Sequence, residues 1–269
     1  MNCITEKEIL GEAELLDLAE RERRQVRQTT SVHPQMTVDD AYRVQAAWLD
    51  IRVDRGEKVI GHKIGLTSRA MQQAMNITTP DSGFLTDAMV FAADQPVTAA
   101  DFCDLRLEVE LAFVLADDLA GGDLSIDEVL DATDHVTAAV ELIAARTPRT
   151  DPVSGRTRTV VDTIADNAAD AGVVTGGEPL APRRTDLRWV GAVAYRNGAA
   201  EETGLAAGVL GHPANGIVWL ARRYAERGLK LEAGQLILSG SFTRPMTVSP
   251  GDDFRFDFNT LGAFDIAIV

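Results

Sequence analysis

The sequence is poor in cysteine, poor in basic residues and free of long apolar runs. The two cysteines, Cys3 and Cys103, stand far apart in the chain, which argues against a disulfide framework and for a reducing compartment. No stretch approaches the ~20 apolar residues of a membrane-spanning helix, and residues 1–20 lack the basic-then-apolar order of a signal peptide. We therefore expect a cytoplasmic protein.

The shortage of basic residues also limits the partners. There are 41 acidic side chains against 26 basic ones, giving a formal net charge of −15. Such a chain repels phosphate backbones and anionic membrane surfaces, so neither nucleic acid nor a membrane is an expected partner. An anionic substrate would gain no long-range attraction from this surface. It would need a local positive centre, either a metal ion or a few placed cations.

What the chain does have is apolar material for one large catalytic domain, with 45% hydrophobic and 25% charged residues among 269. Residues 1–56 are expected to form a helical N-terminal layer, because apolar residues recur at helical spacing in 6–28 and 38–55. Residues 57–269 are expected to form a mixed-β catalytic domain joined to that layer as one unit. A helix is expected to follow Gly216 and to end near Arg227.

Short β-branched runs separated by glycine and proline predict the strands of this second part. The predicted strands are 59–66, 105–116, 136–144, 187–195, 235–239, 254–258 and 264–269, with a hairpin turn at 259–262. Because strands outnumber helices without alternating regularly with them, we predict an α+β fold with mixed or antiparallel sheet and peripheral helices.

Three acidic residues point to a metal site. Glu108 and Glu110 share one parity of the predicted strand, which places both carboxylates on one face with Cα atoms about 6.5–7 Å apart. Glu141 is a lone acid within the apolar run 138–144, where an unpaired carboxylate would be costly to bury. Oxygen ligands without a nearby His or Cys pattern suit Mg²⁺ or Mn²⁺ rather than zinc. The alternative is that Glu108 and Glu110 line a solvated sheet face.

Lys63 has two interpretations. It is either an exposed strand lysine or a proton-transfer group with a lowered pKa. Its glycine-flanked strand runs into residues 66–68, whose backbone donors could face a ligand, although the segment lacks the lysine and hydroxyl of a nucleotide-binding loop. His62 and His212 stand beside glycines without a partner at metal-ligand spacing, so we interpret them as capping or packing residues.

Taken in order, several segments resemble the hydratase and decarboxylase group of the fumarylacetoacetase superfamily, which acts in aromatic-compound catabolism. The matching segments are Gly61-His-Lys-Ile-Gly-Leu-Thr-Ser68, Pro80-Asp81 with Gly83, Glu108-Val-Glu-Leu-Ala-Phe-Val114, Val140-Glu-Leu-Ile143, Asp162-Thr-Ile-Ala-Asp-Asn-Ala-Ala169, His212-Pro-Ala-Asn-Gly216 and Gly240-Ser-Phe-Thr-Arg-Pro245. One departure is Ser82, which stands where the related enzymes usually carry an aromatic residue. The resemblance therefore does not define the pocket size near Asp81.

The resemblance implies roles for individual residues. Glu108, Glu110 and Glu141 would bind Mg²⁺ or Mn²⁺, and Lys63 and Asp81 would transfer protons. The residues expected to contact substrate are Leu66, Thr67, Ser68, Asp162, Asn167, Ser241, Thr243 and Arg244. The resemblance also implies a bent, mixed β-sheet or β-roll core of the fumarylacetoacetase C-terminal type with N-terminal and flanking helices, and a ring-like homo-oligomer.

The implied activity is metal-dependent addition of water to a 2-hydroxy-2,4-dienoate, giving a 4-hydroxy-2-oxo acid. One alternative is decarboxylation of a 2-oxo-3-enedioate, because the same metal chelate would stabilise the enolate left by CO₂ loss. Another is a catalytically silent subunit that binds oxo acids. A cluster of arginines in or beside the loop 147–159 either holds a second carboxylate of a dicarboxylate substrate or neutralises nearby acids. These arginines are Arg146, Arg149, Arg156 and Arg158.

Overall fold

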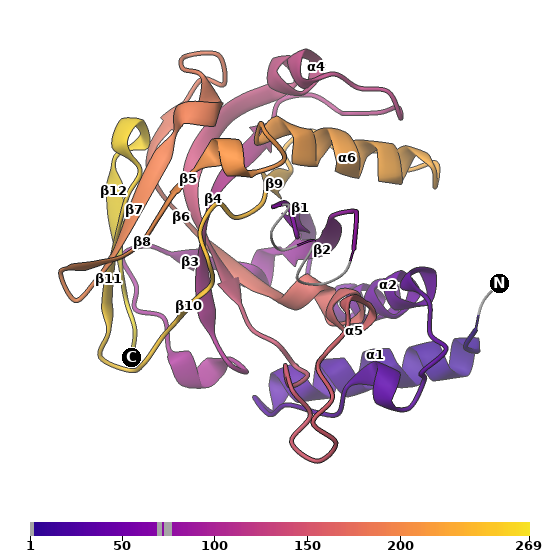
Figure 1. The fold of residues 1–269 in the computed structure, drawn as a ribbon. Helices are drawn as coiled ribbons and strands as arrows, with labels where there is room; N and C mark the ends of the chain where they lie inside the picture. The colour runs from indigo at the N-terminus through magenta and orange to yellow at the C-terminus, as the bar shows by residue number, and fades with distance from the viewer. Residues whose placement is uncertain (1–2, 69–71, 73–76) are drawn as a thin grey trace.

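Two β-sheets and a set of helices make up the computed structural model, which describes residues 3–68, 72 and 77–269 (Figure 1). The first sheet has eight strands in the order β2-β1-β9-β4-β5-β6-β3, with β10 also paired to β4. The second has four strands in the order β12-β11-β7-β8. In the first sheet β1 pairs in parallel with β9 and β3 in parallel with β6, while the other pairs are antiparallel. The predicted α+β class with a mixed sheet is confirmed.

The strands are β1 (Val59–Gly65), β2 (Asp81–Thr86), β3 (Val90–Ala92), β4 (Arg106–Leu115), β5 (Thr133–Ile143), β6 (Asp170–Leu180), β7 (Gly191–Arg196), β8 (Ala199–Leu205), β9 (Leu236–Leu238), β10 (Met246–Thr247), β11 (Asp253–Asp257) and β12 (Ala263–Ala267). The helices are α1 (Glu6–Arg21), α2 (Val38–Asp54), α4 (Ile126–Asp131), α5 (Val160–Ala165) and α6 (Ala214–Ala225). Among these helices, within the described residues, none has the length and apolar character needed to cross a membrane.

Local sequence explains several of these elements. Capping boxes begin α1 at Thr5 and α2 at Thr37, where a threonine hydroxyl accepts the N–H of the third helical residue and that residue's carboxylate accepts in return. The predicted hairpin at the C-terminus is confirmed, because β11 and β12 pair antiparallel around a short turn at Asn259–Leu261. The strand predicted at 187–195 instead begins at Gly191, since Leu187–Trp189 form a 3₁₀ turn.

The first sheet has apolar packing on both faces. On one face, Leu107, Val109, Leu111 and Phe113 of β4 belong to a core shared with the second sheet, α4 and α6. On the other face, Ala112 belongs to a second core shared with α1, α2 and β2. The even-numbered face of β4, which carries the glutamates, therefore turns toward the N-terminal helices. The domain boundary at residue 56 stays a prediction.

Candidate metal centre and proton-transfer pair

The three predicted glutamates converge. Glu108 of β4 lies directly opposite Glu141 of β5 in the strand register, and Glu110 follows two residues along the same face. One carboxylate oxygen from each lies within 4.8 Å of the others. Glu110 and Glu141 are fully buried. Glu110 Oε2 accepts the N–H of Gly240 at 2.8 Å, whereas its Oε1 has no hydrogen-bond partner among the residues that the structure describes.

Burial of these acids makes them a natural cation site. Burial, followed by repulsion from Glu141, raises the pKa of Glu108 to about 8, and the same causes raise the pKa of Glu110 well above its usual value. A bound cation would remove this penalty, and hard carboxylate oxygens fit Mg²⁺ or Mn²⁺. The residues present therefore fit the predicted metal. The alternative of a solvated sheet face is wrong for Glu110.

Lys63 belongs to the same cluster. It lies on β1 with only 3% of its surface exposed, and its Nζ is 2.9 Å from Glu141 Oε1. The interpretation as an exposed strand lysine is therefore wrong. Burial alone would lower the pKa of Lys63, but the carboxylates of Glu141 and Asp81 outweigh it and raise the pKa above its usual value. This is opposite to the lowered pKa of the second interpretation, so the carboxylates keep Lys63 a cation.

Asp81 and Lys63 both lie beside Gly65. Gly65 and Asp81 are paired across β1 and β2, and a Cβ on Gly65 would overlap Asp81 Oδ1 and lie 3.2 Å from Lys63 Nζ. The carboxylate and the ammonium thus share the space that the missing side chain leaves. Burial raises the pKa of Asp81 to about 6, with the positive charge of Lys63 acting in the opposite direction. A carboxyl of this pKa can change protonation state near neutral pH, which suits proton transfer.

Residues 66–68 continue from β1 at this end of the site. Leu66 has φ +57°, a left-handed conformation that is strained for a leucine and is often found at functional sites. Thr67 is buried against Gly240, where a Cβ on the glycine would overlap the threonine side chain. Because Gly240 also donates to Glu110, this segment lies next to the metal cluster. Substrate contact by Leu66, Thr67 and Ser68 stays a prediction.

Several other predicted contact residues use their polar atoms within the protein. The Asp162 carboxylate accepts from the Thr30 backbone and from the hydroxyls of Thr30 and Thr159 at 2.7–2.8 Å. Asn167 is hydrogen-bonded to the backbone of Phe84 in both directions. Their direct contact with substrate is untested.

The loop after β9 supports β4. Ser241 Oγ donates to the carbonyl of Val109 at 3.2 Å, and Thr243 Oγ1 accepts the Val109 N–H at 3.2 Å. Val109 stands between the two metal-site glutamates of β4, so these hydroxyls hold that strand in place. Arg244 has 83% of its side chain exposed and forms an ion pair with Glu202 at 2.6 Å. These three substrate contacts also stay predictions.

Asp170, at the start of β6, is a site residue that the sequence analysis missed. It is 1% exposed, its Oδ1 accepts the Gly172 N–H at 3.1 Å, and its Oδ2 has no partner in the described part of the chain. Burial and then the charge of Glu141 raise its pKa well above the usual value, while Lys63 opposes this shift. The signal that revealed Glu141 was present here too, since Asp170 is a lone acid heading the apolar run 171–174.

The loop arginines differ in how much of their charge is already used. Arg146 is 1% exposed, and its guanidinium bonds the Asp166 carboxylate at 2.6 Å and the carbonyls of Asp166 and Asp170. Arg158 has 16% of its side chain exposed, and its contacts with the Thr147 carbonyl at 3.4 Å and with Asp166 at 3.7 Å are longer. Its positive charge also acts on Asp81 and offsets part of the rise in the pKa of that carboxyl.

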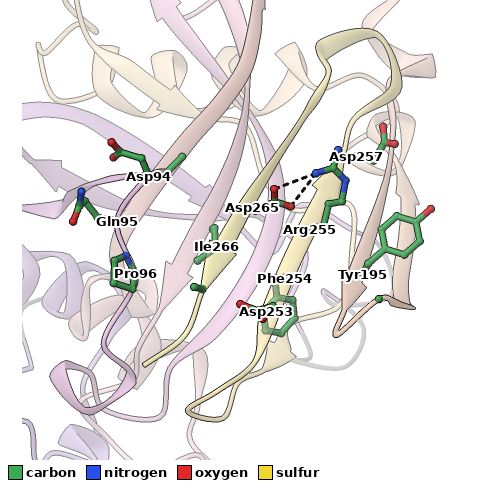
Figure 2. Close-up of a pocket in the computed structure, with 13 residues that line it drawn as sticks. Asp94, Gln95, Pro96, Tyr195, Asp253, Phe254, Arg255, Asp257, Asp265 and Ile266 are labelled. Atoms are coloured by element: carbon green, nitrogen blue, oxygen red, sulfur yellow. Dashed lines mark hydrogen bonds and ion pairs between the residues drawn. The ribbon is translucent and has the colours of Figure 1, made fainter.

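A separate groove of about 780 Å³ lies against the second sheet (Figure 2). Its lining includes Asp94, Tyr195 and Asp257, and its arginine, Arg255, is bound to Asp265 at 3.0 Å. The groove includes neither the metal cluster nor Lys63. The convergent carboxylates beside Lys63 and Asp81 therefore mark the better candidate for chemistry.

Comparison with known proteins shows the family of this chain. The family model described as fumarylacetoacetate (FAA) hydrolase C-terminal matches residues 25–269. A protein of Escherichia coli named 2-oxo-hept-4-ene-1,7-dioate hydratase is 49% identical over 257 residues, which cover 96% of each chain. A 2-keto-4-pentenoate hydratase of Paraburkholderia xenovorans is 39% identical over 86% of this chain and 83% of the relative. The solved structure of 4-oxalocrotonate decarboxylase from Pseudomonas putida G7, complexed with magnesium and adipate, is 32% identical and covers 100% of both chains with a TM-score of 0.95.

Proposed function

Because this chain belongs to the fumarylacetoacetate (FAA) hydrolase C-terminal family, we propose that it is a divalent-metal-dependent hydro-lyase of aromatic-compound catabolism. Its reaction is the addition of water to a 2-hydroxy-2,4-dienoate of the 2-oxo-hept-4-ene-1,7-dioate type. The observation that carries this proposal is the convergence of Glu108, Glu110 and Glu141 within 4.8 Å, with Lys63 2.9 Å from Glu141. The chain surrounding this site is 49% identical to a hydratase of that name.

The metal and the protein have separate tasks. Mg²⁺ or Mn²⁺ held by the three glutamates would act as a Lewis acid toward the carboxylate and C2 oxygen of the substrate. Asp81 takes up and releases protons, while Lys63 keeps its proton and its positive charge. Both are buried and lie beside Gly65, so a proton can pass between substrate and carboxyl without exchange with bulk water.

The chemistry proceeds in two steps. The substrate enol loses its O–H proton while C5 gains one, giving a 2-oxo-3-enoate whose C4 is electrophilic. Water then adds, with its hydroxyl on C4 and its proton on C3, to give the 4-hydroxy-2-oxo acid. Asp81, with a pKa of about 6, can accept one proton and return it, while Lys63 keeps a positive charge beside the developing enolate.

Decarboxylation is the second candidate. Curated 4-oxalocrotonate decarboxylases match most of this chain at 32–35% identity, and the structural likeness to the solved one is close. The fold therefore does not separate the two activities, whereas sequence identity favours the hydratase. Adipate in that solved relative is a dicarboxylate, which supports a dicarboxylate substrate for the present chain. A silent oxo-acid-binding subunit is less favoured, because the three glutamates, Lys63 and Asp81 all converge.

The test is a turnover screen of pure protein with Mg²⁺ or Mn²⁺ on mono- and dicarboxylate dienoates. Loss of the conjugated absorbance would be followed together with CO₂ release. We expect formation of a 4-hydroxy-2-oxo acid without CO₂. Stoichiometric CO₂ would establish the decarboxylase instead, and absence of turnover on every dienoate would favour the silent subunit.

Two further properties belong to this proposal. The homo-oligomer suggested by the family resemblance would be detected as a multiple of 29.0 kDa by light scattering after gel filtration. A cytoplasmic location fits a chain with only two cysteines, Cys3 and Cys103.

A further inference from the structure

Side chains, rather than a further strand, complete the outer edge of β2. Among the described strands β2 pairs with β1 alone, and in this antiparallel pair Ser82 and Phe84 direct their backbone groups away from β1. The Ser82 N–H donates to Tyr42 Oη at 3.2 Å and its carbonyl accepts from Gln45 Nε2 at 2.8 Å. All four outward backbone groups of Ser82 and Phe84 therefore have partners, because Asn167 serves both groups of Phe84.

Asn167 does this with one carboxamide. Its Oδ1 accepts the Phe84 N–H at 2.8 Å and its Nδ2 donates to the Phe84 carbonyl at 3.0 Å, as a neighbouring strand would. The residue is 1% exposed and has φ +51°, a left-handed conformation that asparagine tolerates better than most residues. Gly83 allows this approach, since a Cβ there would lie 2.6 Å from the Asn167 carbonyl oxygen and 2.9 Å from its Oδ1.

Asp81 depends on this strand for its position. It is 1% exposed, and neither of its carboxylate oxygens has a hydrogen-bond partner within the part of the chain that the structure describes. Its side chain is thus fixed through the backbone of β2 and by contact over Gly65. A shift of β2 relative to β1 would move the Asp81 carboxylate relative to Lys63.

We propose that Asn167 is a positioning residue that clamps β2 in place of a missing strand and thereby sets Asp81 against Lys63. This role differs from substrate contact and rests on the proposed function, in which Asp81 transfers protons. Tyr42 and Gln45, which lie three residues apart on α2, complete the same clamp. Helix α2 therefore contributes to catalysis without touching the reacting atoms.

The principal variant is Asn167→Asp, which keeps the size and the acceptor but turns a carboxylate oxygen toward the Phe84 carbonyl. Asn197→Asp is a matched control. Asn197 also has φ +51°, donates to Asp252 Oδ1 and accepts from the Asp253 N–H, but it lies in the turn between β7 and β8 of the other sheet. Tyr42→Phe, which removes the hydroxyl that accepts the Ser82 N–H, takes the place of Asn167→Asp should that variant fail to fold.

Two measurements test the clamp. Amide hydrogen exchange of residues 81–86 should accelerate in Asn167→Asp and stay unchanged in Asn197→Asp. In Asn167→Asp, kcat for a dienoate that the wild type turns over should fall on the order of 10²-fold, the effect of displacing a catalytic group by about 1 Å. KM and Mg²⁺ affinity should stay within about threefold of the wild-type values. Asn197→Asp should stay within about twofold in kcat.

The results that would overturn the proposal are distinct. Unchanged exchange of residues 81–86 would show that Asn167 does not clamp β2. Faster exchange with wild-type kcat would show that the clamp does not set Asp81, and a raised KM with unchanged kcat would make Asn167 a substrate contact. A wild type without turnover on any dienoate would refute the hydratase assignment, and the exchange measurement would then decide the clamp alone.

Discussion

Three carboxylates that face one another, those of Glu110 and Glu141 fully buried, raise the free energy of the folded chain unless protons or a cation neutralise them. Glu110 shows this most clearly, because it is fully buried and one of its oxygens has no hydrogen-bond partner among the described residues. Lys63 neutralises only part of the charge, through Glu141 at 2.9 Å. The site is therefore built for a further positive charge, and each residue's contribution can be measured separately.

We predict that Glu108→Gln, Glu110→Gln and Glu141→Gln each keep the fold and weaken Mg²⁺ binding. Each substitution removes a charged ligand with little change in volume, and activity should fall with metal affinity. Calorimetric titration with Mg²⁺ is the measurement, and Glu14→Gln, an exposed residue of α1, makes the same charge change away from the site. Wild-type Mg²⁺ affinity in all three variants would show that the metal site lies elsewhere.

Lys63→Met should separate metal binding from catalysis. It removes the ammonium beside Glu141 while keeping an apolar stem of similar length, so Mg²⁺ should bind at least as tightly as to the wild type. Turnover should fall by about 10²- to 10³-fold, because the variant lacks the positive charge that would stabilise the developing enolate. Lys58→Met, at an exposed position just before β1, is the control. A kcat near that of the wild type would show that Lys63 is not needed for catalysis.

At the scale of elements, the catalytic pair depends on how closely β1 approaches β2. Gly65 of β1 pairs with Asp81, and Gly83 of β2 pairs with Lys63. A side chain on Gly65 would occupy the space of the Asp81 carboxylate, and one on Gly83 would occupy the space of Asn167. Main-chain geometry is thus as much a part of the site as the charged atoms are.

Gly65→Ala tests this close approach. The new Cβ would overlap Asp81 Oδ1 and crowd Lys63 Nζ, so we expect kcat to fall by roughly 10²-fold through misplacement of the pair. Gly11→Ala on α1, where a Cβ would meet nothing within 4 Å, should instead stabilise the fold by about 0.4–1 kcal/mol with unchanged kcat. Steady-state kinetics and thermal unfolding of both variants are the measurements. Wild-type kinetics in Gly65→Ala would show that the pair tolerates a wider spacing.

At the scale of the whole molecule, the sequence predicts those strands whose own residues show a regular apolar pattern. β4 was found because apolar residues occupy one parity throughout 106–115, and Glu141 was found because it interrupts an apolar run. β2 was missed, since Asp81–Thr86 has no alternation and its outer edge is completed by Tyr42, Gln45 and Asn167 from distant segments.

Long-range packing explains the other misses as well. β6 contains Gly172, Gly176 and Gly177, which weaken any strand pattern, and Gly176 is required because the ring of Phe264 lies against it. The sequence also does not determine which hydrogen-bond partner a serine or threonine hydroxyl has. Ser241 and Thr243 were predicted to contact substrate by resemblance, and the structure reveals their bonds to the backbone of β4.

The preference for a mono- or dicarboxylate substrate depends on the charge distribution of the whole molecule. A chain with a net charge of −15 can hold a second substrate carboxylate only through a cation that its own acids have not already neutralised. Arg146 is bound by Asp166, Arg156 donates to the Thr30 carbonyl at 3.0 Å, and Arg244 is paired with Glu202. Arg158, with long contacts and an effect on Asp81, is the best placed of the predicted arginines.

We therefore predict that Arg158→Gln lowers kcat/KM for a dicarboxylate dienoate. The loss of transition-state stabilisation should be about 1.5–3 kcal/mol, the scale of a charged hydrogen bond. The kcat/KM for a monocarboxylate dienoate should stay nearly unchanged. Arg183 is the control, because its guanidinium is exposed and pairs with Asp127 and Asp131. Arg183→Gln should leave kcat/KM unchanged for both substrates.

Three further variants, Arg149→Gln, Arg156→Gln and Arg244→Gln, would be measured in parallel. A selective loss of kcat/KM for the dicarboxylate in one of them would assign the distal carboxylate site to that residue. If the wild type prefers monocarboxylates, or if no arginine variant changes the ratio between the two substrates, the dioate assignment fails. The enzyme would then belong with hydratases of shorter dienoates, and the charge of the loop would serve only to neutralise its neighbouring acids.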